Sequence, residues 1–300
     1  MMNTRKRLRE LPLHFMLLPG VIILFVYSYI PMIGISIAFQ QFVPTNGLFG
    51  SKWIGTANFR YVMQMPDILQ VLWNTVYIAS MKIAAGLIVP VFIALLLNEL
   101  KKELIKRGIQ TLIYLPHFLS WIILGGILID ILSPSQGIVA QLFRAVGLDP
   151  IFFLGSNQWF PYVIVLSDIW KEFGFSTIVF LAAITGINPS LYEAAIVDGA
   201  SHWRQAWHVT LPGMLPIIVL MATLSLGNVL NAGFDQIFNL YGPVVYESGD
   251  ILDTLIYRMG LIDAQFGVAT AIGLLKSLVS TILISISYYM AYRIANYRIF

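Results

Sequence analysis

The chain has 300 residues, of which 58% are hydrophobic and only 11% are charged, and its mean hydropathy is +0.80. Soluble domains carry about 25% charged residues, so this composition excludes an ordinary soluble protein and predicts an integral membrane protein. The net charge of +3 arises from short basic clusters beside apolar runs, which is typical of membrane topology and not of nucleic-acid binding, and the absence of cysteine excludes disulfides and thiolate metal sites.

Six apolar segments reach the roughly 20 residues that a membrane-spanning helix needs. In chain order they are about 13–39, 71–98, 111–132, 159–186, 210–231 and 267–295. The first is too long, and too often interrupted by proline, for a cleaved signal peptide, so we interpret it as an uncleaved span. The sequence therefore predicts an all-α integral membrane protein with six transmembrane helices, forming a single domain over residues 1–300.

Lysine and arginine are distributed unevenly between the two sides of these spans. If the N-terminus is cytoplasmic, eleven of the 18 basic residues lie on that side and four on the other, while Lys82, Lys171 and Lys276 lie within spans. Because cytoplasmic loops carry the excess of positive charge, we expect a multi-pass protein of the cell (inner) membrane with cytoplasmic N- and C-termini. Residues 187–209, between the fourth and fifth spans, are then also cytoplasmic.

The last outer segment, residues 232–266, carries five acidic residues and one basic residue, Arg258. At about 35 residues it is longer than a simple connection requires. Two interpretations remain open, namely a solvated loop with a short helix near 249–259 and a docking surface for an external partner.

The amphipathic residues 188–209 interrupt the apolar runs. Ser190 followed three residues later by Glu193 predicts a capping box that starts a new helix. Gly199 permits a turn, and the two tryptophans of the stretch SHWRQAWHV fall four residues apart, on one face of a second short helix. Two such short helices are poorly stable alone, so the pattern predicts a hairpin that rests on another surface.

The stretch EAAIVDGASHWRQAWHVTLP, residues 193–212, resembles the EAA signature of the permease subunits of ABC importers. The matching positions are Glu193, Ala194, Ala195, Gly199, Val209, Leu211 and Pro212, with valine at an aliphatic position. The stretches SDIWKEFGFSTIVFLAAITGINPSLYEAAIVDGA, NVLNAGFDQIFNLYGP and ATAIGLLKS are similar to the LplB-type branch, which handles oligo- and polysaccharides. The resemblance covers about residues 10–300 and implies the fold of a type I ABC importer permease with a cytoplasmic coupling helix.

The resemblance also implies roles for the hairpin, because in this family the coupling helix sits in a groove on a separate ATPase subunit. The implied coupling residues are Glu193, Ala194, Ala195, Asp198, Gly199, Arg204, Leu211 and Pro212. Glu193 would be the electrostatic contact, Gly199 the turn, and the alanines would allow close approach. The alternative is a helix lying on lipid headgroups, which favours a polar face rich in lysine and arginine; this face has Arg204 as its one basic residue.

The function implied by the resemblance is ATP-driven, binding-protein-dependent import of oligo- or polysaccharides, uronate-containing acidic polymers included. The expected partners are a second permease subunit in a heterodimer, a cytoplasmic ATPase dimer, an extracytoplasmic solute-binding protein, membrane lipid and the saccharide substrate, with no nucleic acid. No cofactor is expected in this chain, since ATP and Mg²⁺ belong to the ATPase partner. The stretch GLLKS is not a phosphate-binding loop, because Leu275 precedes Lys276 where that motif requires glycine. We therefore expect the chain not to be an enzyme.

Polar residues within the spans are candidates for the translocation path, because ionisable groups in a membrane are costly and usually face a cavity or a partner. The candidates are Lys82, Glu172, Asn228, Asn231, Asp235 and Lys276. Asn228, Asn231 and Asp235 fall at helical spacing in span five. This stripe could contact sugar hydroxyls or, equally, form interhelical hydrogen bonds. Asp168 and Lys171 are expected to pair locally on span four. Lysines facing the path would favour an anionic saccharide.

Two other classes of protein compete with this interpretation. A secondary sugar transporter working without an ATPase would show internal repeats or paired broken helices, and the sequence shows neither pattern. A membrane enzyme would need a catalytic constellation, and the only candidate, the charged cluster Asp168, Lys171 and Glu172, has no nucleophile or metal partner in the sequence pattern.

Overall fold

The computed structural model describes residues 4–100, 102–227 and 229–295, and these residues are almost entirely helical. Their strands are a two-residue antiparallel pair, β1 (Gln40–Gln41) and β2 (Lys52–Trp53), with Gln40 opposite Trp53. The chain divides into two compact units, residues 1–65 with 256–274, and residues 66–255 with 275–300. The all-α class predicted from the sequence is confirmed.

The first unit begins with α1 (Thr4–Leu24), which continues through a π-helical turn (Phe25–Tyr29) into a 3-10 stretch (Ile30–Phe39). Short helix α2 (Gly47–Gly50) lies between β1 and β2 in the sequence, and α3 (Ala57–Gln64) follows β2. Buried Asn58 on α3 ties these elements together, since its amide donates to the carbonyl oxygens of Ala38 at 2.9 Å and Gln40 at 3.0 Å.

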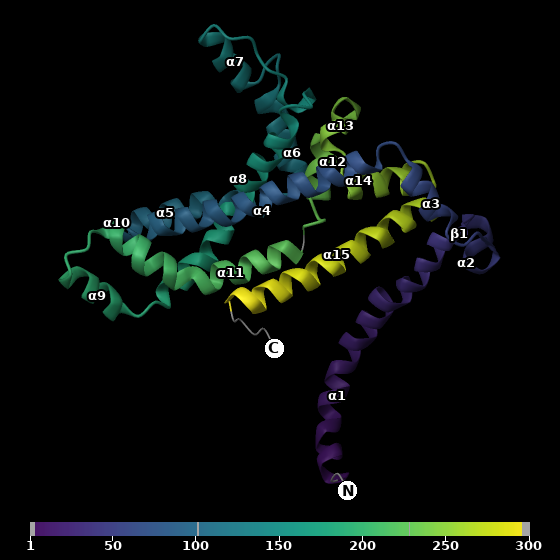
Figure 1. Cartoon of the computed structure of the whole chain (residues 1–300), viewed down its shortest axis with the longest axis horizontal. Helices are drawn as coiled ribbons and strands as arrows, with labels where there is room; N and C mark the ends of the chain where they lie inside the picture. The colour runs from purple at the N-terminus through teal and green to yellow at the C-terminus, as the bar shows by residue number, and fades with distance from the viewer. Residues whose placement is uncertain (1–3, 101, 228, 296–300) are drawn as a thin grey trace. The chain divides into compact units, whose positions relative to one another are not determined.

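The second unit is built on two long helices that pack against each other, α4 (Ile68–Asn98) and α8 (Phe160–Thr185). Buried apolar side chains join them to the rest of the unit, with Ile78, Phe160 and Ile237 in one cluster and Phe180 and Met214 in another. The remaining helices of this unit are α5 (Glu103–Tyr114), α6 (Trp121–Leu132), α7 (Ile138–Ala145), α9 (Pro189–Val197), α10 (His202–Gln205), α11 (Leu211–Gly227), α12 (Phe234–Leu240) and α13 (Tyr246–Gly249). In Figure 1, α9 and α10 turn back on each other as a hairpin.

Two helices contribute to both units, α14 (Leu252–Tyr257) and α15 (Phe266–Ala295). A helix therefore does occur within the predicted range 249–259, but the segment 232–266 is not an ordinary solvated loop. Its buried side chains include Ile237, Leu240, Val245, Ile251, Leu252 and Leu255.

The helices of the described residues account for all six predicted spans. Four are long and apolar enough to cross a membrane singly, Leu13–Phe39, Ile68–Asn98, His202–Gly227 and Phe266–Ile286. Two bent pairs complete six if each counts as one span, Glu103–Phe118 with Trp121–Leu132, bent by 103°, and Phe160–Thr185 with Pro189–Val197, bent by 72°. The chain is thus a multi-pass membrane protein.

Three sequence-based expectations about these helices were wrong. The third span is not one helix over 111–132, because a 3-10 turn around Pro116 separates α5 from α6, and proline cannot donate the hydrogen bond that would continue the helix. The fifth begins at His202 and not near 210, so the second arm of the hairpin is the first part of that span. The cap of α9 is Asn188, whose side-chain oxygen accepts from the Ser190 amide at 3.0 Å, and not Ser190.

Candidate functional site

The turn between α9 and α10 depends on Gly199, which has φ = 72°. In this left-handed conformation the Ala200 amide donates to the carbonyl of Ala195 at 2.8 Å, and the Gly199 amide donates to the carbonyl of Ile196 at 3.0 Å. This hydrogen-bond pair is the Schellman arrangement that satisfies the last carbonyls of a helix and for which glycine is preferred. Gly199 therefore ends α9 and reverses the chain toward Ser201.

The hairpin is held closed by polar contacts between its arms. The Tyr192 hydroxyl on α9 lies 3.0 Å from Oγ1 of Thr210, and Thr210 is buried just before α11 begins at Leu211. Gln205, also buried, donates from Nε2 to the carbonyl oxygen of Ala200 at 2.9 Å. These contacts fix α9 against the first turns of the continuous helix that runs from His202 to Gly227.

The outer surface of the hairpin is acidic and apolar. Glu193, Ala194 and Asp198 are exposed, and Val197 has 86% of its side chain exposed. Of the other predicted coupling residues, Arg204 and Pro212 are exposed, while Ala195 and Leu211 are half-buried. Neither acidic residue forms an ion pair with any residue that the structure describes. Carboxylates and large apolar side chains left open on such a short hairpin are what a protein partner would cover.

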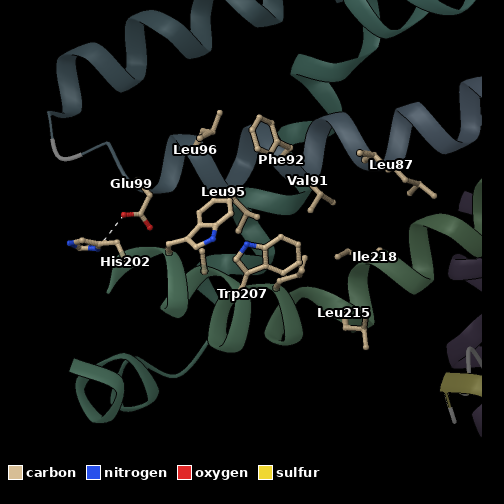
Figure 2. Close-up of a pocket in the computed structure, with 14 residues that line it drawn as sticks. Leu87, Val91, Phe92, Leu95, Leu96, Glu99, His202, Trp207, Leu215 and Ile218 are labelled. Carbon is tan, nitrogen blue, oxygen red and sulfur yellow. Dashed lines mark ion pairs between the residues drawn. The ribbon is translucent and has the colours of Figure 1, made fainter. Parts of the chain in front are cut away.

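The two tryptophans of the hairpin belong to a different surface. Trp203 and Trp207 lie edge to face with ring centroids 5.8 Å apart, as their spacing predicted, and they line an apolar groove of about 740 Å³ between α4 and α10–α11. Figure 2 shows Trp207 beside Val91 and Leu95 of α4, and Trp203 lines the same groove. At one end of the groove, Nδ1 of His202 lies 3.2 Å from the carboxylate of Glu99.

Sequence reasoning missed the pairing of Glu99 with His202, which joins the end of α4 to the start of α10. Glu99 lies in a polar connection, and His202 lies within the stretch 193–212 but at none of the specified positions of the EAA signature. No local pattern could have paired them, because their proximity depends on how α4 packs against α10–α11.

Lys82 lies at the centre of a buried polar cluster that joins α4, α8 and the stretch 231–236. Its ammonium is 3.1 Å from Asp168 Oδ1, donates to the carbonyl oxygen of Ala232 at 2.8 Å, and also donates to the side-chain oxygen of Gln236. Gln236, which the sequence analysis did not select, is fully buried, and its amide donates to Ser167 Oγ at 2.8 Å. The side chain of Lys82 is only 9% exposed.

The expected local pair of Asp168 and Lys171 is wrong, because Asp168 pairs with Lys82 across helices. Lys171 instead contacts Glu172 at 2.9 Å and donates to the carbonyl oxygen of His117 at 2.8 Å. The Glu172 carboxylate also lies 2.7 Å from Nδ1 of His117. These contacts hold the turn between α5 and α6 against α8. The charged cluster on span four is therefore divided, because Asp168 contacts α4 whereas Lys171 and Glu172 contact His117.

Lys276 of α15 forms a second cluster, with Asp253 Oδ1 at 2.5 Å and Asn231 Oδ1 at 2.8 Å. The proposed stripe through span five is wrong as a helical stripe, because α11 ends at Gly227 and the chain turns at Gly233, which has φ = 97°. Asp235 therefore lies on a separate helix, α12, where it is exposed, and Asn228 lies outside the described residues.

Four of the predicted path residues therefore either lie in the stretch 231–236 or contact it. Lys82 holds this stretch from α4 and Lys276 holds it from α15, and Asn231 and Asp235 belong to it. Glu172 belongs to the separate cluster at His117. Within the described part of the chain there is no group of three or more histidine or acidic side chains that could hold a metal ion.

Comparison with known proteins agrees with this architecture. The chain is 39% identical over 282 residues to the polygalacturonan/rhamnogalacturonan transport system permease protein YteP of Bacillus subtilis (strain 168), covering 94% of this chain and 88% of that one. It is 38% identical over 283 residues to protein LplB of the same organism, covering 94% and 89%. The LplB-type resemblance is thereby confirmed.

The fold also matches a solved structure. A chain in the crystal structure of a bacterial ABC transporter involved in the import of the acidic polysaccharide alginate aligns with a TM-score of 0.90 and 37% identity, over 97% of this chain and 98% of that chain. The family model described as binding-protein-dependent transport system inner membrane component matches residues 83–296. The chain therefore belongs to the family of binding-protein-dependent transport system inner membrane components.

Proposed function

We propose that this chain is a permease subunit of an ATP-driven, binding-protein-dependent importer of acidic oligo- or polysaccharides. The observation that carries the proposal is the likeness, over 97% of the chain, to a chain of a transporter for the acidic polysaccharide alginate. A relative at 39% identity whose name refers to polygalacturonan and rhamnogalacturonan supports the same substrate class. Alginate is acidic and the two galacturonans contain galacturonate, so a carboxylate-bearing saccharide is common to all three polymers.

The hairpin of α9 and α10 is, in this proposal, the contact with a separate ATPase dimer that binds ATP and Mg²⁺. The excess of lysine and arginine on one side of the spans supports cytoplasmic termini and a cytoplasmic hairpin. Because α10 and α11 form one helix from His202 to Gly227, a displacement of the hairpin passes directly into a membrane span. Closure of the ATPase dimer would therefore reorient the path formed with a second permease subunit. A solute-binding protein would deliver the saccharide from outside.

Lys82 and Lys276 are the groups in this proposal that favour an anionic substrate. Each is paired with an aspartate in the structure, Asp168 and Asp253 respectively, so the resting protein carries no uncompensated charge at either lysine. A substrate carboxylate can replace an aspartate as the partner when the spans rearrange. An isolated charge in a membrane is costly, and exchange between partners avoids that cost.

The test is reconstitution of the chain in liposomes with its second permease, ATPase and binding protein. We expect trigalacturonate to stimulate ATP hydrolysis and to be accumulated only when ATP is supplied. Uptake that continues without the ATPase would overturn the proposal in favour of a secondary transporter.

The charge preference has its own control in the same system. The Lys82→Met/Lys276→Met double variant should lose uptake of trigalacturonate, whereas the single variant Lys102→Met, which changes an exposed lysine outside the spans, should not. Unchanged uptake of the acidic substrate by the double variant would remove both lysines from the path.

A further inference from the structure

A polar cleft of about 400 Å³ lies between the N-terminal ends of α4 and α8, and neither the sequence analysis nor the coupling mechanism uses it. Its walls combine aromatic and amide side chains, principally Gln70, Trp73, Tyr77, Asn157, Gln158 and Tyr162. Among the described residues that line the cleft, the single charged side chain is Glu247 of α13.

The cleft is at the opposite end of α4 from the coupling hairpin. Glu99, which follows the last residue of α4, contacts His202 at the start of α10, whereas Gln70 and Trp73 lie in the first turns of α4. With 31 residues, α4 is about 46 Å long, which exceeds the roughly 30 Å of the hydrocarbon layer. The end of α4 that carries the cleft therefore reaches the membrane surface remote from the ATPase, where substrate arrives.

The polar wall of the cleft is held by an ordered set of hydrogen bonds. Asn157 donates from Nδ2 to Glu247 Oε2 at 3.2 Å, and its Oδ1 accepts from the Ser248 hydroxyl at 2.9 Å. Buried Asn74 donates to the carbonyl oxygen of Glu247 at 2.9 Å and accepts from Gln70 Nε2 at 2.9 Å. Helix α13 is thus fixed to both α4 and the start of α8, so the cleft is built into the fold.

The aromatic wall comes from both long helices. The rings of Trp73 and Tyr77 lie one helical turn apart and are nearly parallel, with centroids 6.0 Å apart and planes at 15°. Tyr162 of α8 lines the same cleft as these two rings. Trp73 keeps 61% of its side chain exposed, so a large aromatic surface remains available beside the amides.

We propose that this cleft is an outer saccharide subsite, where a sugar ring packs against Trp73 and Tyr77 while its hydroxyls bond to the amides of Gln70 and Gln158. The proposal deepens the proposed function and rests on it for the identity of the ligand. Because Glu247 is an acceptor and no cation is among the cleft residues, the subsite recognises the ring and its hydroxyls and not the uronate carboxylate. That carboxylate points away from the cleft.

The competing reading is a belt of interfacial aromatics facing lipid headgroups. Such a belt explains Trp73 and the tyrosines, but it does not explain why amides and a carboxylate, ordered by hydrogen bonds to one another, line the same cleft. A docking surface for the solute-binding protein is the other outcome that the experiment distinguishes.

The absence of cysteine from the chain allows a direct test by labelling. In the reconstituted complex, Gln158→Cys places a thiol in the cleft, and Gln136→Cys places one at an exposed glutamine of the same connecting segment but outside the cleft. We expect saturating trigalacturonate to slow the reaction of Gln158→Cys with a membrane-impermeant maleimide about fivefold or more, and to leave Gln136→Cys unchanged. Tricarballylate, which has carboxylates but no sugar ring, should protect neither.

Two results would overturn the subsite. One is no protection of Gln158→Cys by trigalacturonate, whether or not this sugar stimulates ATP hydrolysis. The other is protection by the solute-binding protein alone, without sugar, which would make the cleft a docking surface. Protection without stimulated ATP hydrolysis would instead retain the subsite and contradict the proposed function, so the two failures are distinguishable.

A second pair of variants tests the aromatic wall in the Gln158→Cys background. Trp73→Ala should raise the concentration of trigalacturonate needed for half-protection about three- to tenfold, on the scale of an aromatic contact, while Trp73→Phe should change it less than twofold. Leu69→Ala alters a neighbouring exposed residue of α4 that is not among the cleft residues and serves as the control. Equal effects of Trp73→Ala and Trp73→Phe would exclude ring packing as the source of binding.

Discussion

Lys82 on α4 and Asp168 on α8 form an ion pair across two membrane spans, with Nζ 3.1 Å from Oδ1 and the lysine side chain 9% exposed. The same ammonium bonds to Ala232 and Gln236, so one lysine fixes two spans and the stretch that follows α11. Each of the two charges within the membrane spans, the Lys82 ammonium and the Asp168 carboxylate, is therefore compensated by the other.

The pair should make the two residues strongly interdependent in stability. Asp168→Asn leaves a buried ammonium with only neutral acceptors, and we expect it to lower the free energy of unfolding by about 3 kcal/mol. The double variant Lys82→Met/Asp168→Asn should lose less than the sum of the two single variants, because it leaves no unpaired charge. Thermal unfolding in detergent measures these differences, and strictly additive losses would show that the pair contributes no coupling.

Replacing Gly199 should distort the hairpin through its backbone alone. A Cβ at this position meets no atom within 4 Å, but φ = 72° is unfavourable for alanine, so Gly199→Ala should cost about 1–2 kcal/mol locally. Gly108→Ala, at a helical glycine of α5 that is equally open, should be neutral or stabilising. We expect faster amide hydrogen exchange of residues 195–201 only in Gly199→Ala. Equal exchange in both variants would mean that the turn tolerates alanine.

Glu193→Ala tests the proposed contact with the ATPase. Because Glu193 is exposed and has no ion pair within the described chain, its removal should leave thermal stability unchanged. It should nevertheless reduce substrate-stimulated ATP hydrolysis about tenfold, a loss of about 1.4 kcal/mol in coupling. Glu103→Ala, which removes an exposed acid of α5 that pairs only with Arg107 of the same helix, is the control. Normal coupling in Glu193→Ala would show that the hairpin carboxylate is not the contact.

Gly174 on α8 lies where α5 approaches most closely. A Cβ at this position would overlap the backbone of Ile113, so Gly174→Ala must push α5 away from α8. Overpacking of this kind costs about 1–3 kcal/mol, and we expect a lower midpoint of thermal unfolding. Gly126→Ala in α6 adds the same methyl group where nothing lies within 4 Å. A similar midpoint for both variants would mean that the α5–α8 contact is loose.

Local sequence properties were enough to predict the helical class, the six apolar segments and the turn at Gly199. Mean hydropathy over about 20 residues reports which segments can enter a membrane, and a left-handed backbone position selects glycine whatever surrounds it. Competing local signals were harder to rank. Both Asn188 and Ser190 are good capping residues, and the helix starts at the first because Pro189 occupies its first position, where its missing amide hydrogen is tolerated.

The sequence by itself therefore determined which segments are apolar enough to cross a membrane, where the hairpin turns and which residues are charged within the spans. Only the tertiary structure decided the partners, namely Lys82 with Asp168, Lys276 with Asp253, and Glu99 with His202. It also decided that Trp73 and Tyr162, on separate helices, line one cleft. The physical reason is that hydropathy and backbone preference act within a few residues, whereas these contacts depend on the rotation and register of whole helices, which are set by packing along their full faces.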